Sequence, residues 1–230
     1  MNIHVVAVNV GDHFEPAYVE LLQAGFRQHL SLKHDFTVIT DNPSAYPGMR
    51  SVESTQDAPP SWWHKFQIFR DDIWPEKETV FYVDLDSVVI GSLDKLAERK
   101  GFNMIGWNGK WYPYGSGVMV FPAGRAPELS TFDYRDSFLY DKGDQQRIAE
   151  YFQEQIQPIR SNEVSSYKRD GWSLTGNEPG EGFEHLTPRT ERSSIIAFHG
   201  TPRPHQLADG HWIKKKWKDS HFPCANGRGR

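Results

Sequence analysis

The sequence has a single cysteine and no long hydrophobic run. Because Cys224 stands alone, an internal disulfide and a zinc site built from several cysteines are both excluded. No apolar stretch reaches the roughly 18 residues that a membrane-spanning helix needs. Residues 1–10 pass straight into a strand-like pattern without a basic leader or a small-residue cleavage site, so we expect no signal peptide. These absences favour a reducing, cytoplasmic setting.

An excess of positive charge is also lacking. The chain carries 26 Lys and Arg against 30 Asp and Glu, which gives a formal net charge of -4. This mild acidity provides no electrostatic footprint for nucleic acid or for an anionic membrane. There is no Walker A loop, no G-x-G-x-x-G motif, and no Ser-His-Asp or Cys-His pattern. Eight Trp residues are present, but aromatic rings pack in cores as well as against sugars and bases.

The spacing of apolar residues predicts strands alternating with helices. Nearly continuous apolar runs, typical of buried strands, cover residues 3–8, 36–40, 79–83, 102–107, 118–121 and 195–198. Helical spacing covers residues 16–30, 62–74 and 143–153. The opening β-α-β order implies a right-handed crossover and parallel strands. We therefore predict an α/β fold with a Rossmann-like, mostly parallel sheet and helices on both faces.

The remaining segments are predicted to be loops or a tail. Residues 42–60 and 170–190 are rich in Pro, Gly or Ser and have no clear period, which is typical of loops. Residues 214–230 are basic and poor in apolar side chains, so we expect a peripheral segment there. No internal repeat or second domain is visible. We predict one domain over residues 1–217 and a polar tail over 218–230.

Asp84 and Asp86 give the sharpest chemical signal. They stand two apart where the strand over 79–83 ends, and residues two apart on a strand point to the same side. Two neighbouring carboxylates repel each other unless a cation lies between them, and hard oxygen ligands suit Mg²⁺ or Mn²⁺. The alternative is a pair of loop carboxylates that cap the next helix. The apolar residues that follow, 88–93, favour a site within the core instead.

His199 and its neighbours give a second signal. His199 directly follows the apolar strand over 195–198 and could bind the same cation if that strand lay beside the one ending at Asp84. Gly200 permits a tight turn and the close approach of a ligand, and Arg203 offers a planar fork for a diphosphate. Lys65 could supply another positive charge. The alternative is that these are an ordinary strand-end histidine and ordinary surface cations.

A third group begins the helix predicted over 143–153. Asp144 and Gln145 follow Gly143, where an acidic residue often serves only to cap the helix. The functional interpretation is a carboxylate and an amide beside a bound sugar. Tyr167 and Lys168 form a possible further contact, although their spacing indicates nothing specific.

With these residues identified, the chain resembles the GT-A-fold glycosyltransferases, most closely the glycogenin-like family 8. The segments that match the family's blocks, in the family's order, are FYVDLDSVVIGSL (81–93), GSGVMVF (115–121), GDQQRI (143–148) and FHGTPRPH (198–205). The chain is also similar to small phage and bacterial proteins that carry WWxKF, SYK and HGxPRP segments. The resemblance spans residues 1 to about 217.

The resemblance implies a role for each block. The metal ligands, for Mn²⁺ or Mg²⁺, would be Asp84, Asp86 and His199. Asp144 and Gln145 would lie near the donor sugar and its anomeric carbon. The residues beside the nucleotide sugar would be Asn9, Lys65, Asp84, Ser116, Gly200 and Arg203. The chain departs from the family at Gly115, where the family has Asn, at Arg203, where it has Lys, and at His205, where it has Trp.

The implied activity is transfer of a sugar, with retention of anomeric configuration, from a nucleotide-diphosphate sugar to a hydroxyl group. A uridine diphosphate sugar is the expected donor, and the acceptor could be a glycan, a lipid-linked sugar or a protein. One alternative is a carbohydrate-binding or partner-binding domain of the same fold without turnover. Another is a nucleotidyltransferase, which ranks lower because residues 9–14 lack a Gly-rich, basic loop.

Overall fold

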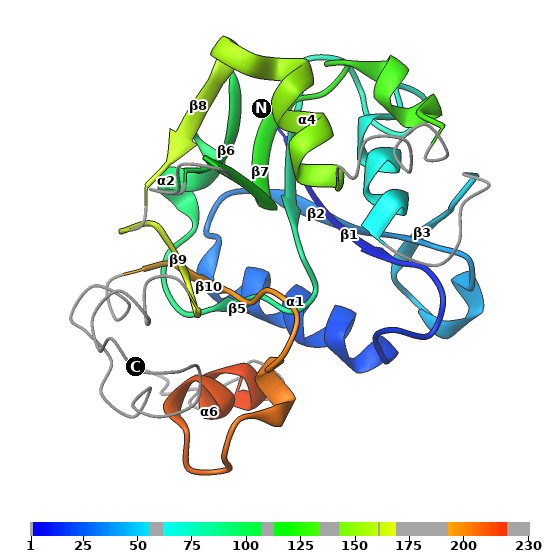
Figure 1. Ribbon diagram of the computed structural model, residues 1–230. Helices are drawn as coiled ribbons and strands as arrows, with labels where there is room; N and C mark the ends of the chain where they lie inside the picture. Colours follow the sequence, from blue (N-terminus) through cyan, green and yellow to red (C-terminus); the bar gives the residue numbers. More distant parts are fainter. Residues whose placement is uncertain are drawn as a thin grey trace, which may run out of the picture.

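A seven-stranded sheet forms the centre of the computed structural model, which describes residues 2–55, 62–106, 113–133, 143–160, 162–168 and 193–219 (Figure 1). In order across the sheet, the strands are β3 (Arg50–Glu53), β2 (His34–Thr40), β1 (Ile3–Asn9), β4 (Thr79–Val83), β7 (Tyr114–Pro122), β6 (Phe102–Gly106) and β8 (Ile156–Ile159). Neighbouring strands are parallel except where β7 pairs with β4 and with β6. The predicted α/β fold with a mostly parallel sheet is confirmed.

Helices cover both faces of this sheet, as predicted. On one face lie α1 (Pro16–His29) and α2 (Asp94–Ala97). On the other lie the 3₁₀-helices η2 (Trp62–Phe69) and η3 (Pro127–Thr131) and the helix α4 (Asp144–Phe152). Successive side chains of β1 therefore enter different cores, with Val5 packing beneath α1 and Val6 packing beneath η2. This two-sided burial explains why β1 is apolar at nearly every position.

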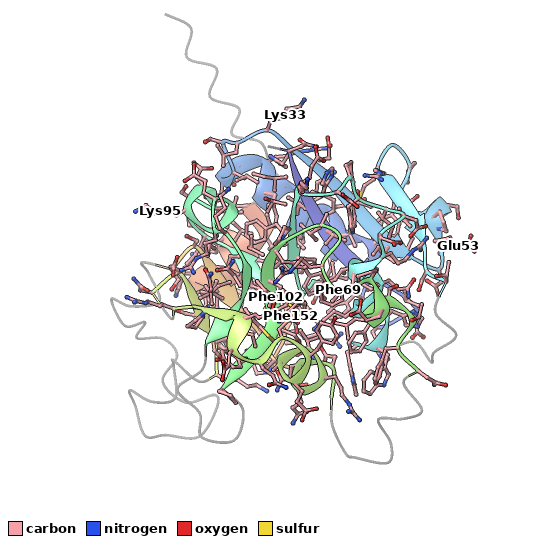
Figure 2. The ribbon with its side chains drawn as sticks, turned by 90° about the horizontal axis from the view of Figure 1, so that it is seen from above. Lys33, Glu53, Phe69, Lys95, Phe102 and Phe152 are labelled. Carbon is pink, nitrogen blue, oxygen red and sulfur yellow. The ribbon has the colours of Figure 1, made fainter. Side chains whose placement is uncertain are left out.

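Aromatic packing attaches α4 to the sheet. The rings of Phe102 on β6 and Phe152 on α4 stack with their centroids 3.5 Å apart. Phe69 of η2 lies against both, at 6.3 Å from Phe102 and 6.0 Å from Phe152 (Figure 2). All three side chains are fully buried. The contacts hold η2 and α4 in place, and both helices carry residues that the sequence analysis singled out.

A smaller sheet of three strands lies beside the large one (Figure 1). It consists of β5 (Val88–Val89), β10 (Ile195–Ala197) and β9 (Val164–Ser166). β10 pairs antiparallel with β5, which begins two residues after Asp86, and it pairs parallel with β9. The strand before His199 therefore does not lie beside β4, which was the condition under which His199 was expected to reach the same cation. It reaches the Asp-x-Asp segment through β5 instead.

Several segments differ from the sequence-based expectations. The predicted loop over 42–60 contains the 3₁₀-turn η1 (Pro43–Ala45) and the edge strand β3, whose polar residues hide its strand character. Helical structure predicted over 62–74 is a 3₁₀-helix that ends at Phe69. Further 3₁₀-turns are η4 (Gln153–Gln155) and η6 (Pro204–Gln206).

The C-terminal part of the described chain is more ordered than a peripheral tail. The helix α6 (Trp212–Asp219) packs against η6 and α1, and Ile213 is fully buried. The many lysines of α6 make the segment look polar in the sequence, although a few apolar residues pack it against the rest of the protein. The predicted loop at 170–190 and residues 220–230 of the predicted tail lie outside the described residues. None of the helices described is long and apolar enough to cross a membrane.

Candidate active site

A cavity of about 450 Å³ opens where β1 and β4 end. Asn9 is the last residue of β1, and Asp84 directly follows β4, so the cavity lies outside the carboxyl ends of two neighbouring parallel strands. Open α/β sheets bind their ligands at such a position. The lining combines acidic, basic and aromatic side chains. A polar ligand of appreciable size would fit its volume and chemistry.

The ten residues that the family resemblance assigns to a site all line this cavity, whereas Tyr167 and Lys168, the possible further contact, are not part of its lining. The set comprises Asn9, Lys65, Asp84, Asp86, Ser116, Asp144, Gln145, His199, Gly200 and Arg203. The other lining residues are Val8, Val10, His13, Phe14, Trp62, Tyr82, Leu85, Gly117 and Phe198. Residues nearly 200 positions apart in the chain are thus brought together. Their individual roles remain predictions.

Lys65 is the centre of a buried charged cluster. Its ammonium nitrogen lies 2.8 Å from Asp144 Oδ2 and 3.1 Å from Asp84 Oδ1, and it donates a 2.9 Å hydrogen bond to Ser116 Oγ. Burial alone would lower the pKa of Lys65, but the two carboxylates outweigh it and raise that pKa. The ammonium group therefore stays charged and links η2, β4 and α4 at one point of the cavity wall.

The strand β7 contributes Ser116 and Gly117 through an irregularity. Its pairing with β6 shifts between Gly115 and Met119, while the partners Met104 and Ile105 are consecutive. The extra residues form a bulge, a feature that re-aims side chains next to active sites. Ser116 Oγ donates a 2.7 Å hydrogen bond to Asp144 Oδ2. At Gly117 an added Cβ would lie 3.1 Å from Asp84 Oδ2, so glycine leaves room for that carboxylate.

Tyr82 orients the Asp84 carboxylate through a hydrogen bond. Its hydroxyl donates a hydrogen bond to Asp84 Oδ1, and the Lys65 ammonium lies 5.4 Å from the centre of its ring. Burial and the neighbouring Asp84 charge raise the pKa of Tyr82 well above its ordinary value. Tyr82 therefore remains a hydrogen-bond donor at any ordinary pH. The sequence analysis did not select it, although its position two residues before Asp84 on a strand places both on one side.

Among the described carboxylates, Asp86 has the most strongly shifted pKa. Burial and the charge of Asp84 raise its pKa to about 7, against the opposing effects of Lys65 and Arg203. Near neutral pH it is therefore divided between its charged and neutral forms. A carboxylate in a cavity whose pKa is perturbed by burial and by a specific charged neighbour is a candidate functional residue. A cation beside Asp86 would relieve the repulsion and favour the charged form.

The predicted metal ligands share the cavity without forming a finished metal site. Within the described ranges, no three His, Cys, Asp or Glu side chains are grouped so that they could hold a metal ion. Asp84, Asp86 and His199 nevertheless line the same cavity, and the raised pKa of Asp86 reports negative charge that is incompletely compensated. Two carboxylates and an imidazole suit Mn²⁺. The donor set fits the predicted cation in chemistry.

Asn9 presents an amide at the end of β1. Its Nδ2 donates to the Phe14 carbonyl oxygen at 3.1 Å and to the Tyr46 hydroxyl at 2.6 Å. The carbonyl can only accept, so these contacts settle which end of the amide is nitrogen. Oδ1 is buried and has no hydrogen-bond partner among the residues described. Asn9 lines the cavity, so a ligand N–H or O–H group that reached this acceptor would supply its missing partner.

Arg203 joins two loops across the cavity. Its guanidinium lies over the Phe14 ring at 4.3 Å and donates a 2.6 Å hydrogen bond to the His13 carbonyl oxygen. A planar guanidinium can stack and donate at once, which a lysine ammonium cannot do. Nearby, Gly200 has a φ of 68°, a left-handed conformation that favours glycine. Positive charge is therefore held beside a turn where a ligand can approach the backbone.

Sequence reasoning missed the aromatic part of the site. Phe14, Trp62 and Tyr82 all line the cavity, although Trp62 begins the WWxKF segment and Tyr82 lies within the block over 81–93. Trp62 could have been found from its place three residues before Lys65, and Tyr82 from its spacing to Asp84. No sequence signal connects Phe14 with Arg203, because their contact joins segments far apart in the chain.

Comparisons with known proteins bear on the fold. No model of a known protein family matches the sequence, and no curated protein sequence matches it. Among solved structures, galactosyltransferase LgtC in complex with donor and acceptor sugar analogs superposes with a TM-score of 0.66 at 11% identity, covering 96% of this chain and 95% of that one. Glycosyltransferase GlyE from Streptococcus pneumoniae TIGR4 gives a TM-score of 0.68 at 15% identity, covering 96% of this chain and 61% of that one. At such low identity the likeness is one of fold, and the chain has the GT-A-like fold of these glycosyltransferases.

Proposed function

We propose that this protein is a metal-dependent glycosyltransferase that moves a sugar from a nucleotide-diphosphate sugar to a hydroxyl acceptor. The observation that carries the proposal is that one cavity, at the ends of β1 and β4, gathers the ten residues that the family resemblance assigns to the site. Its combination of carboxylates, Lys65 and Arg203 suits a ligand that has both phosphates and sugar hydroxyls. The glycosyltransferase folds of LgtC and GlyE support the same function.

The parts of the donor can be matched to parts of the cavity. Asn9 Oδ1, an unpaired acceptor, would take a hydrogen bond from the nucleoside, and a uridine diphosphate sugar is the donor we propose. Arg203 and the turn at Gly200 would hold the diphosphate. Asp144 and Gln145, at the start of α4, would lie against the transferred sugar, with Asp144 fixed by Lys65 and Ser116.

The proposed reaction exchanges one bond of the anomeric carbon for another. The bond from that carbon to the diphosphate oxygen breaks, and the oxygen keeps the electron pair. The acceptor hydroxyl oxygen forms the new glycosidic bond, and its proton leaves with the diphosphate. Arg203 would stabilise the charge that develops on the diphosphate, and holding both substrates together would supply much of the rate. Retention of configuration is proposed from the family resemblance.

Asp84, Asp86 and His199 would hold the divalent cation, Mn²⁺ or Mg²⁺. When bound, the cation would supply positive charge beside the diphosphate. Asp84 is already oriented by Tyr82 and Lys65, so that one ligand is held before any cation arrives.

Thermal unfolding with a panel of nucleotide sugars, with and without Mn²⁺, tests the proposal. A ligand at about 100 times its Kd stabilises by roughly 2.7 kcal/mol, which raises the Tm of a domain this size by about 5–10 °C. We expect such a rise with one donor, dependent on Mn²⁺ and absent from Asp86→Asn. The matched control is Asp71→Asn, which neutralises an exposed aspartate outside the cavity. No rise with any donor would instead favour a binding domain without this activity.

A further inference from the structure

Trp62 is a large apolar side chain left exposed at the edge of the cavity. Its side chain is 58% exposed, and Tyr151 is the other exposed large hydrophobic residue in the described part of the chain. Single exposed aromatic residues are ordinary on protein surfaces. What distinguishes Trp62 from Tyr151 is its place, because only Trp62 lines the cavity.

Trp62 stands on the same side of its helix as Lys65. Residues three apart in a 3₁₀-helix eclipse each other, and both residues belong to η2. Lys65 contacts Asp144 and Ser116, the polar group proposed to face the transferred sugar. Trp62 is therefore one turn of helix away from the reacting end of the donor, on the solvent side.

The helix that carries Trp62 is firmly anchored. Trp63, the next residue, is buried and stacks on Phe66 and Phe132 at centroid distances of 6.2 Å. Phe66 and Phe132 are themselves 4.9 Å apart. The indole of Trp62 lies 6.3 Å from that of Trp63, at the outer end of this aromatic row. An exposed ring on a rigid support loses little entropy when a ligand covers it.

We propose that Trp62 is the platform on which the acceptor stacks, and that the acceptor is itself a sugar ring. The inference rests on the proposed function and names its acceptor class. A pyranose offers an apolar C–H face to an indole while its hydroxyl groups remain free for polar contacts. The acceptor must enter from solvent, and Trp62 is the exposed aromatic side chain of the cavity wall. Asn9, Phe14 and Arg203, which are linked through the loop after β1, form a separate part of the wall for the nucleotide.

Binding of methyl pyranosides to the full chain tests this inference. The probes are both anomers of the methyl glycosides of glucose, galactose, mannose and N-acetylglucosamine, with UDP and Mn²⁺ present and in their absence. Nitrophenyl glycosides are avoided because their aglycone would itself stack on an indole. Saturation-transfer NMR is recorded for wild type, Trp62→Ala, Trp62→Phe and the matched control Tyr151→Ala. Because both substituted residues are exposed, all variants should fold, which their unfolding midpoints check.

We expect at least one glycoside to bind the wild type, with saturation strongest at the protons of one ring face. The signal should fall at least fivefold in Trp62→Ala and stay within twofold in Trp62→Phe and Tyr151→Ala. Equal signals in wild type and Trp62→Ala would overturn the inference. So would binding of UDP without binding of any glycoside, since the acceptor is then not a sugar ring. Trp62-dependent glycoside binding without UDP binding would instead contradict the nucleotide-dependent function and leave this platform standing.

Discussion

Asp86 links the chemistry of the site to the stability of the fold. Its pKa of about 7 arises from burial and from the charge of Asp84, whereas an unfolded aspartate titrates near 3.8. The native carboxyl therefore binds its proton more tightly than the unfolded one, and the free energy of unfolding falls as pH rises between these two values. Below about pH 4 the Asp86 carboxyl is protonated in both states and does not lower the free energy of unfolding, and above about pH 7 the loss of stability is complete.

Replacing Asp86 with Asn should therefore stabilise the metal-free protein at high pH. A pKa difference of about 3 units corresponds to about 4 kcal/mol, which is the largest gain that we expect at pH 8. The gain should shrink as pH falls through 7 and vanish near pH 4. Urea unfolding of both proteins in EDTA, at several pH values, measures this difference.

The control for this prediction is Asp71→Asn, which changes an exposed aspartate outside the cavity. Its free energy of unfolding should follow that of the wild type within about 0.5 kcal/mol at every pH. A stability difference for Asp86→Asn that is constant with pH would show that the Asp86 carboxyl does not titrate as stated. The nucleotide-sugar experiment compares the rise in Tm that a ligand causes in each protein. A higher Tm of ligand-free Asp86→Asn therefore does not affect that comparison.

At the residue scale, the sequence singled out residues that line the cavity, but it did not predict their contacts. Asp84, Asp86 and Asp144 carry recognisable spacing, because strand ends and helix starts place side chains in known directions. Their partners depend on tertiary structure. Nothing in the sequence shows that Lys65 bridges Asp84 and Asp144, since these three residues come from separate elements.

The aromatic contact between α4 and the sheet is the main element-scale feature that positions the site. Phe152 ends α4 and stacks on Phe102 and near Phe69, while Asp144 begins the same helix (Figure 2). Phe152→Ala should lower the free energy of unfolding by about 3–5 kcal/mol, because it removes a fully buried ring and leaves a cavity. Urea denaturation gives the value.

The neighbouring residue provides the control for Phe152. Tyr151 is 41% exposed on the same helix, so Tyr151→Ala should cost less than about 1 kcal/mol. Similar losses from both substitutions would mean that helix propensity, rather than ring stacking, attaches α4 to the sheet.

The strands that the sequence predicted well are buried on both faces, and the helix that it predicted well buries one face at a clear helical period. β1, β4 and residues 36–40 of β2 are nearly continuous apolar runs, and α1 has the helical period. The missed strands are short or mixed in polarity. β8 contains Pro158 at the edge of the sheet, and β5 has two residues, so neither offers a period to detect. The type of η2 was also missed, because three-residue and 3.6-residue spacing differ little over eight residues.

At the scale of the whole molecule, the cavity depends on contacts between a loop near the start of the described chain and a loop near its end. The loop between β1 and α1 supplies His13 and Phe14, and the loop between β10 and α6 supplies Arg203. The Tyr18 hydroxyl also contacts His205 Nδ1, which ties α1 to the same loop. The sequence predicted a parallel sheet and a ligand site at its edge. It could not predict which loops meet, because β10 joins the second sheet rather than β4.

Arg203→Lys tests these contacts, because lysine keeps the charge but loses the planar fork that stacks on Phe14 and bonds to the His13 carbonyl. We expect the Kd of UDP, measured by titration calorimetry with Mn²⁺, to rise about tenfold, which is about 1.4 kcal/mol. Arg50→Lys is the matched control, because Arg50 also lies over an aromatic ring, 5.5 Å from the centre of the Trp74 ring, but outside the cavity. It should leave the Kd unchanged. If Arg203→Lys binds UDP as tightly as the wild type, charge alone holds the diphosphate and the contacts between the two loops contribute nothing to donor binding.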